Sequence, residues 1–243
     1  MNDFVILSTE EPQYLFLNKI LKEKKFNNYY FIQETKKKKL NSFFGNFKKS
    51  LKSKKKIKFI IYYFLQLLLF KKYSRKYSFL KKKFFNHYEK KIKDKDKKIQ
   101  KLRIKKNFKN KSLILFGAPY VNSKFIKNFK FVYNIHMGIL PKYAGLKSFE
   151  RMIINENHIG FTLHEVSKEI DKGDIIYKKK LRINSKKDIF QNYMKLFDEV
   201  FNFIFKIIIF KKKINKKNKF INESNLFYGF EFNELDYKKL LKF

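Results

Sequence analysis

An amide, an imidazole and a carboxylate stand at positions in the sequence from which they can act on one reacting atom. Asn134 and His136 lie two positions apart at the end of a predicted β-strand, and residues two apart on a strand share a face of the sheet. Asp171 lies in a loop after a later predicted strand, where a carboxylate can orient an imidazole or share its proton. The three residues are therefore candidate catalytic groups for acid–base chemistry.

The segments after His136 indicate how a pocket would be closed beside these groups. Leu140-Pro-Lys-Tyr-Ala-Gly145 places a proline and a glycine in a turn-rich loop; proline fixes φ, and glycine reaches conformations closed to other residues. Gly160-Phe-Thr-Leu-His164 and Ile170-Asp-Lys-Gly173 then follow in order. An asparagine two residues before a histidine is by itself a weak motif. The motif becomes informative because these three segments follow it in a fixed order.

Together these motifs resemble the folate-dependent formyltransferase family, which includes glycinamide ribonucleotide formyltransferase, the catalytic domain of methionyl-tRNA formyltransferase and sugar-nucleotide N-formyltransferases. The resemblance is strong over about residues 112–182 and looser over 1–35 and 183–210. It implies that 10-formyltetrahydrofolate is the formyl donor, that a primary amine on a small molecule is the acceptor, and that no metal is required.

The resemblance also implies roles for individual residues. Asn134 and a protonated His136 would donate hydrogen bonds to the oxyanion of a tetrahedral intermediate. Asp171 would favour the imidazolium and, through a water, help to move the proton from the amine to the departing folate nitrogen. His164 is expected to support these groups rather than to react. The residues expected to hold the folate are Gly117, Ala118, Pro119, Tyr120, Ser167 and Ile170.

The elements that would position these groups predict an α/β fold with a Rossmann-like, mostly parallel sheet and a helical insertion. Predicted strands cover 4–9, 26–32, 112–117, 131–135, 160–166 and 175–181, and predicted helices cover about 12–21, 123–128, 147–155 and 187–211. We expect one catalytic domain over residues 1–210 and a charged tail over 211–243.

A Lys-rich stretch at about 36–111 interrupts this pattern and is the predicted helical insertion. Apolar periodicity predicts helices over 57–70 and 79–88 within it. The first is too short to span a bilayer, which takes about 20 residues. It is predicted to cover a sheet, although its lysine flanks leave peripheral contact with an anionic membrane surface open.

The composition is strongly basic, with 59 lysines and arginines against 21 acidic residues and a formal net charge of +38. Such a charge is typical of nucleic-acid binding, but only four of the basic residues are arginines, the side chain that phosphate and base-edge recognition favours. We therefore interpret most of the charge as solvated surface. The chain has no cysteine, and no signal peptide is predicted, so a cytoplasmic location is expected.

The turn after the first predicted strand bears on the acceptor. Ser8-Thr-Glu-Glu-Pro12 occupies the place where the purine-pathway enzyme has a phosphate-binding glycine loop, and its carboxylates would repel a phosphate. No second β-rich domain for initiator tRNA is expected after the last helix. An amino sugar on a nucleotide is therefore the leading acceptor. Glycinamide ribonucleotide, or a catalytically idle basic protein that binds RNA or another polyanion, stays an alternative, and the oligomeric state is open.

Overall fold

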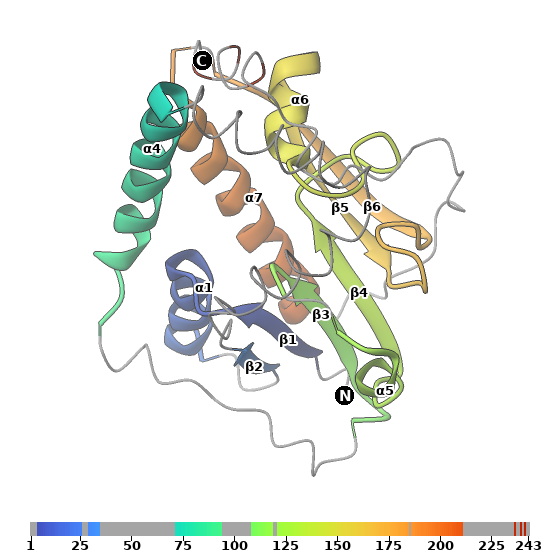
Figure 1. Cartoon of the computed structure of the whole chain (residues 1–243). Helices are drawn as coiled ribbons and strands as arrows, with labels where there is room; N and C mark the ends of the chain where they lie inside the picture. The colour runs from blue at the N-terminus through green and yellow to red at the C-terminus, as the bar shows by residue number, and fades with distance from the viewer. Residues whose placement is uncertain are drawn as a thin grey trace, which may run out of the picture.

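A computed structural model describes residues 4–25, 29–34, 71–93, 108–118, 121–184 and 186–210, with single positions near the C-terminus. Strands and helices alternate along the first part of the chain (Figure 1). In chain order the elements are β1 (Phe4–Thr9), α1 (Pro12–Glu23), β2 (Tyr29–Glu34), α4 (Lys71–Glu89), β3 (Ser112–Phe116), α5 (Ser123–Ile126), β4 (Phe131–His136), α6 (Ser148–Glu156), β5 (His158–Glu165), β6 (Ile175–Arg182) and α7 (Ile189–Phe210).

The strands form one six-stranded sheet in the order β2-β1-β3-β4-β5-β6. The pairs β1–β2, β1–β3 and β3–β4 are parallel, whereas β4–β5 and β5–β6 are antiparallel. The parallel strands β1 and β3 are almost wholly apolar and buried, as expected for strands covered on both faces. The structure confirms the predicted α/β class, and β4 is the strand at which the sheet changes from parallel to antiparallel pairing.

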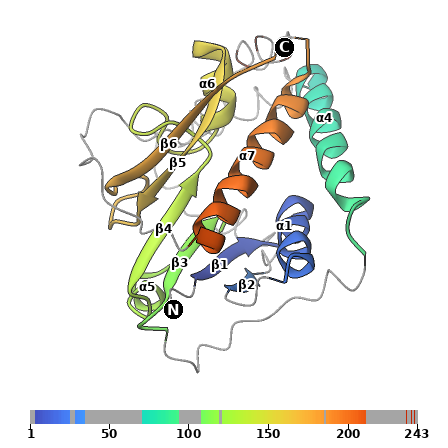
Figure 2. The same cartoon turned by 180° about the vertical axis from the view of Figure 1, so that it is seen from behind.

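Helices cover both faces of the sheet. The main core lies between the sheet and helices α1, α4 and α7, where Tyr14, Phe84, Tyr88 and Phe197 pack together. Figure 2 shows α7 crossing this face beside α1 and α4. A smaller cluster on the other face joins Val5 and Leu7 of β1 to the region of α5.

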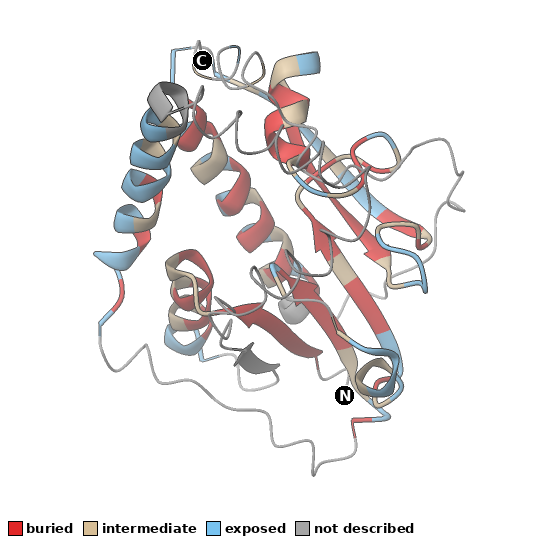
Figure 3. Cartoon of the chain, viewed as in Figure 1, coloured by how far each residue is buried: buried red, intermediate tan, exposed pale blue. Residues whose placement is uncertain are grey.

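Alternation along β1 explains the two cores. Phe4 and Ile6 face the larger cluster, and Val5 and Leu7 face the smaller one, because successive side chains on a strand point to opposite sides. Tyr14, Leu17 and Leu21 lie on the buried face of α1 at the spacing of an amphipathic helix. Figure 3 shows buried residues along β1, and both buried and exposed residues on α1 and α4 beside the sheet.

The insertion contains one described helix. The predicted helical stretch 79–88 forms part of α4, which begins earlier, at Lys71. The predicted helix over 57–70 and most of the tail 211–243 lie outside the described residues. Within the described ranges no helix has the length and apolar character needed to cross a bilayer.

Candidate active site

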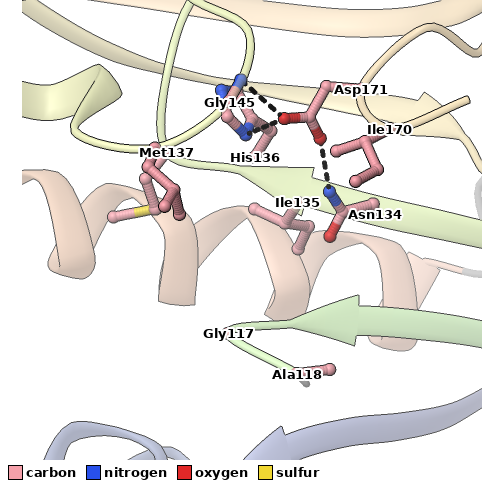
Figure 4. Close-up of a pocket in the computed structure, with 10 residues that line it drawn as sticks. Gly117, Ala118, Asn134, Ile135, His136, Met137, Gly145, Ile170 and Asp171 are labelled. Carbon is pink, nitrogen blue, oxygen red and sulfur yellow. Dashed lines mark hydrogen bonds and ion pairs between the residues drawn. The ribbon is translucent and has the colours of Figure 1, made fainter. Parts of the chain in front are cut away.

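The carboxyl ends of two neighbouring parallel strands open on one cavity of about 440 Å³. β4 supplies Asn134 and His136 to its wall, β3 is followed there by Gly117, and the β5–β6 loop supplies Asp171 (Figure 4). The cavity is lined by Gly117, Ala118, Asn134, Ile135, His136, Met137, Gly145, Leu146, Ile170 and Asp171. The three predicted catalytic residues therefore meet on one wall.

His136 is a buried imidazole held between two oxygen acceptors. Its Nε2 lies 2.7 Å from the carbonyl oxygen of Tyr143, so Nε2 carries the hydrogen that is donated. Its Nδ1 lies 3.4 Å from Oδ2 of Asp171. Burial lowers the pKa of His136, and the Asp171 carboxylate and the Tyr143 carbonyl offset this effect only in part.

This protonation state differs from the protonated ring expected from the sequence. With its pKa below the ordinary value of about 6.5, His136 is mainly neutral at neutral pH. Because Nε2 keeps its hydrogen for Tyr143, Nδ1 has a free lone pair beside Asp171. His136 is therefore placed to accept a proton at Nδ1, where the carboxylate would stabilise the resulting imidazolium.

Asp171 connects the cavity wall to the loop that closes it. Its Oδ2 accepts a hydrogen bond of 2.9 Å from the backbone N–H of Gly145, and its Oδ1 lies 3.4 Å from Nδ2 of Asn134. Burial raises the pKa of Asp171, but contacts with His164, His136 and the Gly145 N–H outweigh burial and hold this pKa below its ordinary value. The residue is therefore a carboxylate at neutral pH.

The backbone at Asp171 is left-handed, with φ of 56°. Aspartate and asparagine tolerate this region better than most residues with a side chain. The conformation turns the side chain back toward β4, where it reaches His136 and Asn134. An asparagine at this position would keep the backbone conformation but would remove the charge and one of the two acceptor oxygens.

His164 is a fourth member of the cluster. It is 2% exposed and lies directly opposite Asn134 in the β4–β5 register. Its Nδ1 donates to the carbonyl of Glu165 at 2.8 Å, so its Nε2 accepts from Nδ2 of Asn134 at 3.1 Å. It also lies 3.6 Å from Oδ1 of Asp171. These contacts agree with the supporting role expected for it.

Thr162 fixes the loop that leaves β4, a role that the sequence motif did not reveal. Its buried Oγ1 donates to the Gly138 carbonyl at 2.7 Å and accepts from the Leu140 N–H at 3.1 Å. Thr162 also lies opposite His136 in the strand register. One hydroxyl thus ties the loop to β5 at the level of the candidate base.

Replacing Thr162 with valine should lower the free energy of unfolding by about 3 kcal/mol, because it leaves a buried carbonyl and a buried N–H without a partner. Urea unfolding at neutral pH measures the change. Thr162→Ser keeps the hydroxyl and should lose only about 1 kcal/mol for the missing methyl group. Equal losses in the two variants would show that the hydroxyl does not hold the loop.

The residues expected to bind folate separate into three groups. Gly117, Ala118 and Ile170 line the cavity, whereas Ser167 does not line it and instead donates to the Glu169 carbonyl at 2.7 Å. Pro119 and Tyr120 lie outside the described residues. The place of Ser167 in the loop predicts a folate contact, but its hydroxyl is hydrogen-bonded within that loop.

Three apolar lining residues were not predicted: Ile135, Met137 and Leu146. Ile135 lies on β4 between Asn134 and His136, and Met137 packs partly against the main core. Leu146 and Ile170 are 64% and 54% exposed. Large apolar side chains that line a cavity and still face solvent favour a bound ring system. The described residues hold no group of three histidine, aspartate or glutamate side chains arranged for a metal ion.

Residues 119–205 match a family model described as formyl transferase. This match confirms the resemblance that the motifs predict. The phosphoribosylglycinamide formyltransferase of Haemophilus influenzae is 43% identical over 53 residues, which is 21% of this chain and 25% of that protein. The methionyl-tRNA formyltransferase of Streptococcus thermophilus is 33% identical over 80 residues, which is 32% of this chain and 26% of that protein. The alignments thus span about a quarter of each relative.

Solved structures match over nearly the whole chain at lower identity. An N-formyltransferase from Helicobacter canadensis, in complex with folinic acid and dTDP-3-aminofucose, aligns with a TM-score of 0.55 and 20% identity over 100% of this chain and 81% of that chain. The formyltransferase PseJ from Anoxybacillus kamchatkensis, in complex with a UDP-linked formamido sugar and tetrahydrofolate, aligns with a TM-score of 0.53 and 13% identity over 99% and 98%. The chain therefore has the fold of these formyltransferases.

Proposed function

We propose that this chain transfers the formyl group of 10-formyltetrahydrofolate to a primary amine. The convergence of Asn134, His136 and Asp171 on one cavity wall is the observation that carries the proposal. The match of residues 119–205 to the formyl transferase model supports it, because that range contains all three residues.

The geometry is suited to the steps of such a transfer. The amine nitrogen attacks the formyl carbon, the new C–N bond forms, and the bond from that carbon to N10 of the folate breaks. His136 Nδ1 accepts the proton that the amine loses, and Asp171 stabilises the imidazolium until the proton passes to N10. The Asn134 amide donates to the oxyanion after releasing one of its present partners, His164 or Asp171.

The cavity also provides surfaces for the donor. Gly117 and Ala118 present backbone close to the cavity, and Leu146 and Ile170 offer apolar contact for a folate ring. A Cβ at Gly117 would lie 1.9 Å from the Tyr14 hydroxyl, and φ there is 61°, so this position requires glycine. We place the folate against Gly117, Ala118 and Ile170, and contacts from Ser167, Pro119 and Tyr120 stay predictions from the sequence.

The acceptor is proposed to be an amino sugar on a nucleotide. The complexes of similar fold support this acceptor, since they contain dTDP-3-aminofucose or a UDP-linked formamido sugar. The start of α1 argues against a phosphate there. Gln13 donates a 2.9 Å hydrogen bond to the Glu11 carboxylate, and Tyr14, whose pKa is raised first by burial and then by Glu11, packs against the cavity residue Gly117. A carboxylate at this turn disfavours a phosphate bound at the start of α1, the place where the purine-pathway enzyme binds that of its acceptor.

The test measures tetrahydrofolate release and formamide product with two acceptors, dTDP-3-aminofucose and glycinamide ribonucleotide. The amino sugar should give the higher kcat/KM, by roughly tenfold, which corresponds to about 1.4 kcal/mol of repulsion from the half-buried Glu11 carboxylate. Glu11→Gln should narrow the ratio of the two kcat/KM values, because the phosphate of glycinamide ribonucleotide would no longer face a carboxylate at the start of α1. Glu23→Gln, on the exposed end of the same helix, removes the same charge and should leave the ratio unchanged.

The outcomes separate the open alternatives. A higher kcat/KM for glycinamide ribonucleotide would replace the amino sugar as acceptor while keeping the formyl transfer. An absence of both folate binding and tetrahydrofolate release would reject the enzyme and favour a basic polyanion-binding protein that retains the fold.

A further inference from the structure

Helix α4 has one face in the core and another in solvent. Phe84 and Tyr88 are buried against α7, with Phe84 packed on Phe197. On the opposite side the helix is exposed along most of its length, as Figure 3 shows by its pale blue outer surface. The buried face accounts for the position of α4, whereas the outer face makes no contribution to the core.

An exposed aromatic ring stands in the middle of this outer face. Phe79 is 68% exposed, more than any other large hydrophobic residue among those described. Its neighbours at three and four positions in each direction are Arg75, Lys76, Lys82 and Lys83, all exposed. Residues at these spacings are adjacent on a helix surface. We call these five residues the basic aromatic face.

The charge of this face is not balanced within the described structure. No aspartate or glutamate occurs between Lys71 and Tyr88, and no ion pair joins any of the four cations to a carboxylate in the described ranges. Like charges close together on one helix repel each other. An anionic surface would relieve the repulsion and could also cover the exposed ring.

We propose that the basic aromatic face docks the protein on an anionic membrane surface. Lysine and arginine near a bilayer are attracted by anionic headgroups, and an aromatic ring between them can enter the headgroup and acyl boundary. The face is the outer side of a single helix, a shape that lies flat on a bilayer. Single-stranded nucleic acid is instead bound by a basic groove with several stacking rings, and this face presents one ring.

The absence of tryptophan from the chain allows a local test. Phe79→Trp introduces a single tryptophan into the full-length protein at the proposed contact. Its fluorescence should shift to shorter wavelength on vesicles of phosphatidylglycerol and phosphatidylcholine, and should stay unchanged on phosphatidylcholine alone. Phe131→Trp is the matched reporter, since Phe131 is also exposed and lies beside Lys130. It should not shift on either kind of vesicle.

A charge variant provides the second measurement. Each cation near an anionic bilayer contributes about fivefold to the partition coefficient, so Lys82→Gln with Lys83→Gln should weaken vesicle binding roughly 25-fold. Lys124→Gln with Lys127→Gln removes the same charge from exposed positions of and beside α5 and should weaken binding much less.

Three outcomes would overturn the proposal. The fluorescence of the Phe79→Trp protein could stay unchanged on anionic vesicles, the Phe131→Trp protein could shift equally, or single-stranded RNA alone could produce the shift. None of these outcomes bears on formyl transfer.

Discussion

Replacing His136 with glutamine is expected to lower kcat for formyl transfer about a thousandfold, within the range that a positioned general base contributes. The proposed base is Nδ1, which faces Asp171, while Nε2 donates to the Tyr143 carbonyl. A glutamine amide can replace the Nε2 hydrogen bond but has no nitrogen that accepts a proton. Tetrahydrofolate release under saturating substrates measures the loss.

Two further variants make this result specific. His136→Asn places an amide near the position of Nδ1 and should be as inactive as His136→Gln. His87→Gln changes an exposed histidine on α4 and should leave kcat unchanged. Thermal unfolding of all three variants checks that the fold is kept. A His136→Gln protein that folds and retains more than about a tenth of the wild-type kcat, far above the range expected for loss of a base, would remove His136 from the mechanism.

Asp171→Asn is expected to lower kcat about a hundredfold, because the imidazolium of His136 loses the carboxylate that stabilises it. The variant should also move the acid limb of the pH–rate profile to lower pH. The neutral ring is the active form, so kcat/KM should rise with pH through the pKa of His136, which burial holds below its ordinary value. The Asp171 carboxylate raises this pKa, and its removal therefore lowers it. Profiles for wild type and variant, measured with one acceptor, show the shift.

The same variant has a predicted effect on stability. Because the pKa of Asp171 is lowered in the folded protein, its stabilising contribution is present above the unfolded value of about 3.9 and is lost as pH falls through the folded value. The Asp171→Asn protein should lack this part of the pH dependence. Urea unfolding from neutral to acidic pH measures it, and Asp174→Asn in the same loop is the control.

For the kinetic prediction, an acid limb of the pH–rate profile that moves to higher pH in the Asp171→Asn protein would contradict the assigned roles.

The strands, and the meeting of Asn134 and His136 on one cavity wall, were predictable because their signals are local. Buried parallel strands are continuous apolar runs, which Phe4–Thr9 and Ser112–Phe116 illustrate. Asn134 and His136 share a face because they are two apart on β4. Their spacing within a predicted strand therefore indicated that both side chains belong to one site.

Properties set by packing were not predictable in this way. The sequence predicts a protonated His136, but burial under the loop that returns to Tyr143 favours the neutral ring. The hydroxyl of Thr162 finds its partners in a loop more than twenty residues away. The exposure of Leu146 at the cavity likewise depends on how the closing loop lies. Each depends on contacts between distant segments, for which a single sequence gives no signal.

The pairing of Asn134 with His164 across β4 and β5 makes the position of the proposed catalytic amide depend on the alignment of two strands. A slip of one residue would turn His164 and Thr162 to the opposite side of the sheet, so a chain folded with that error would lose the support for its amide and its base together. Turnover per molecule in a refolded sample would then be proportional to the fraction of chains in which these two strands are correctly paired. A measurement of helix content would not detect this difference, because the slip changes no helix.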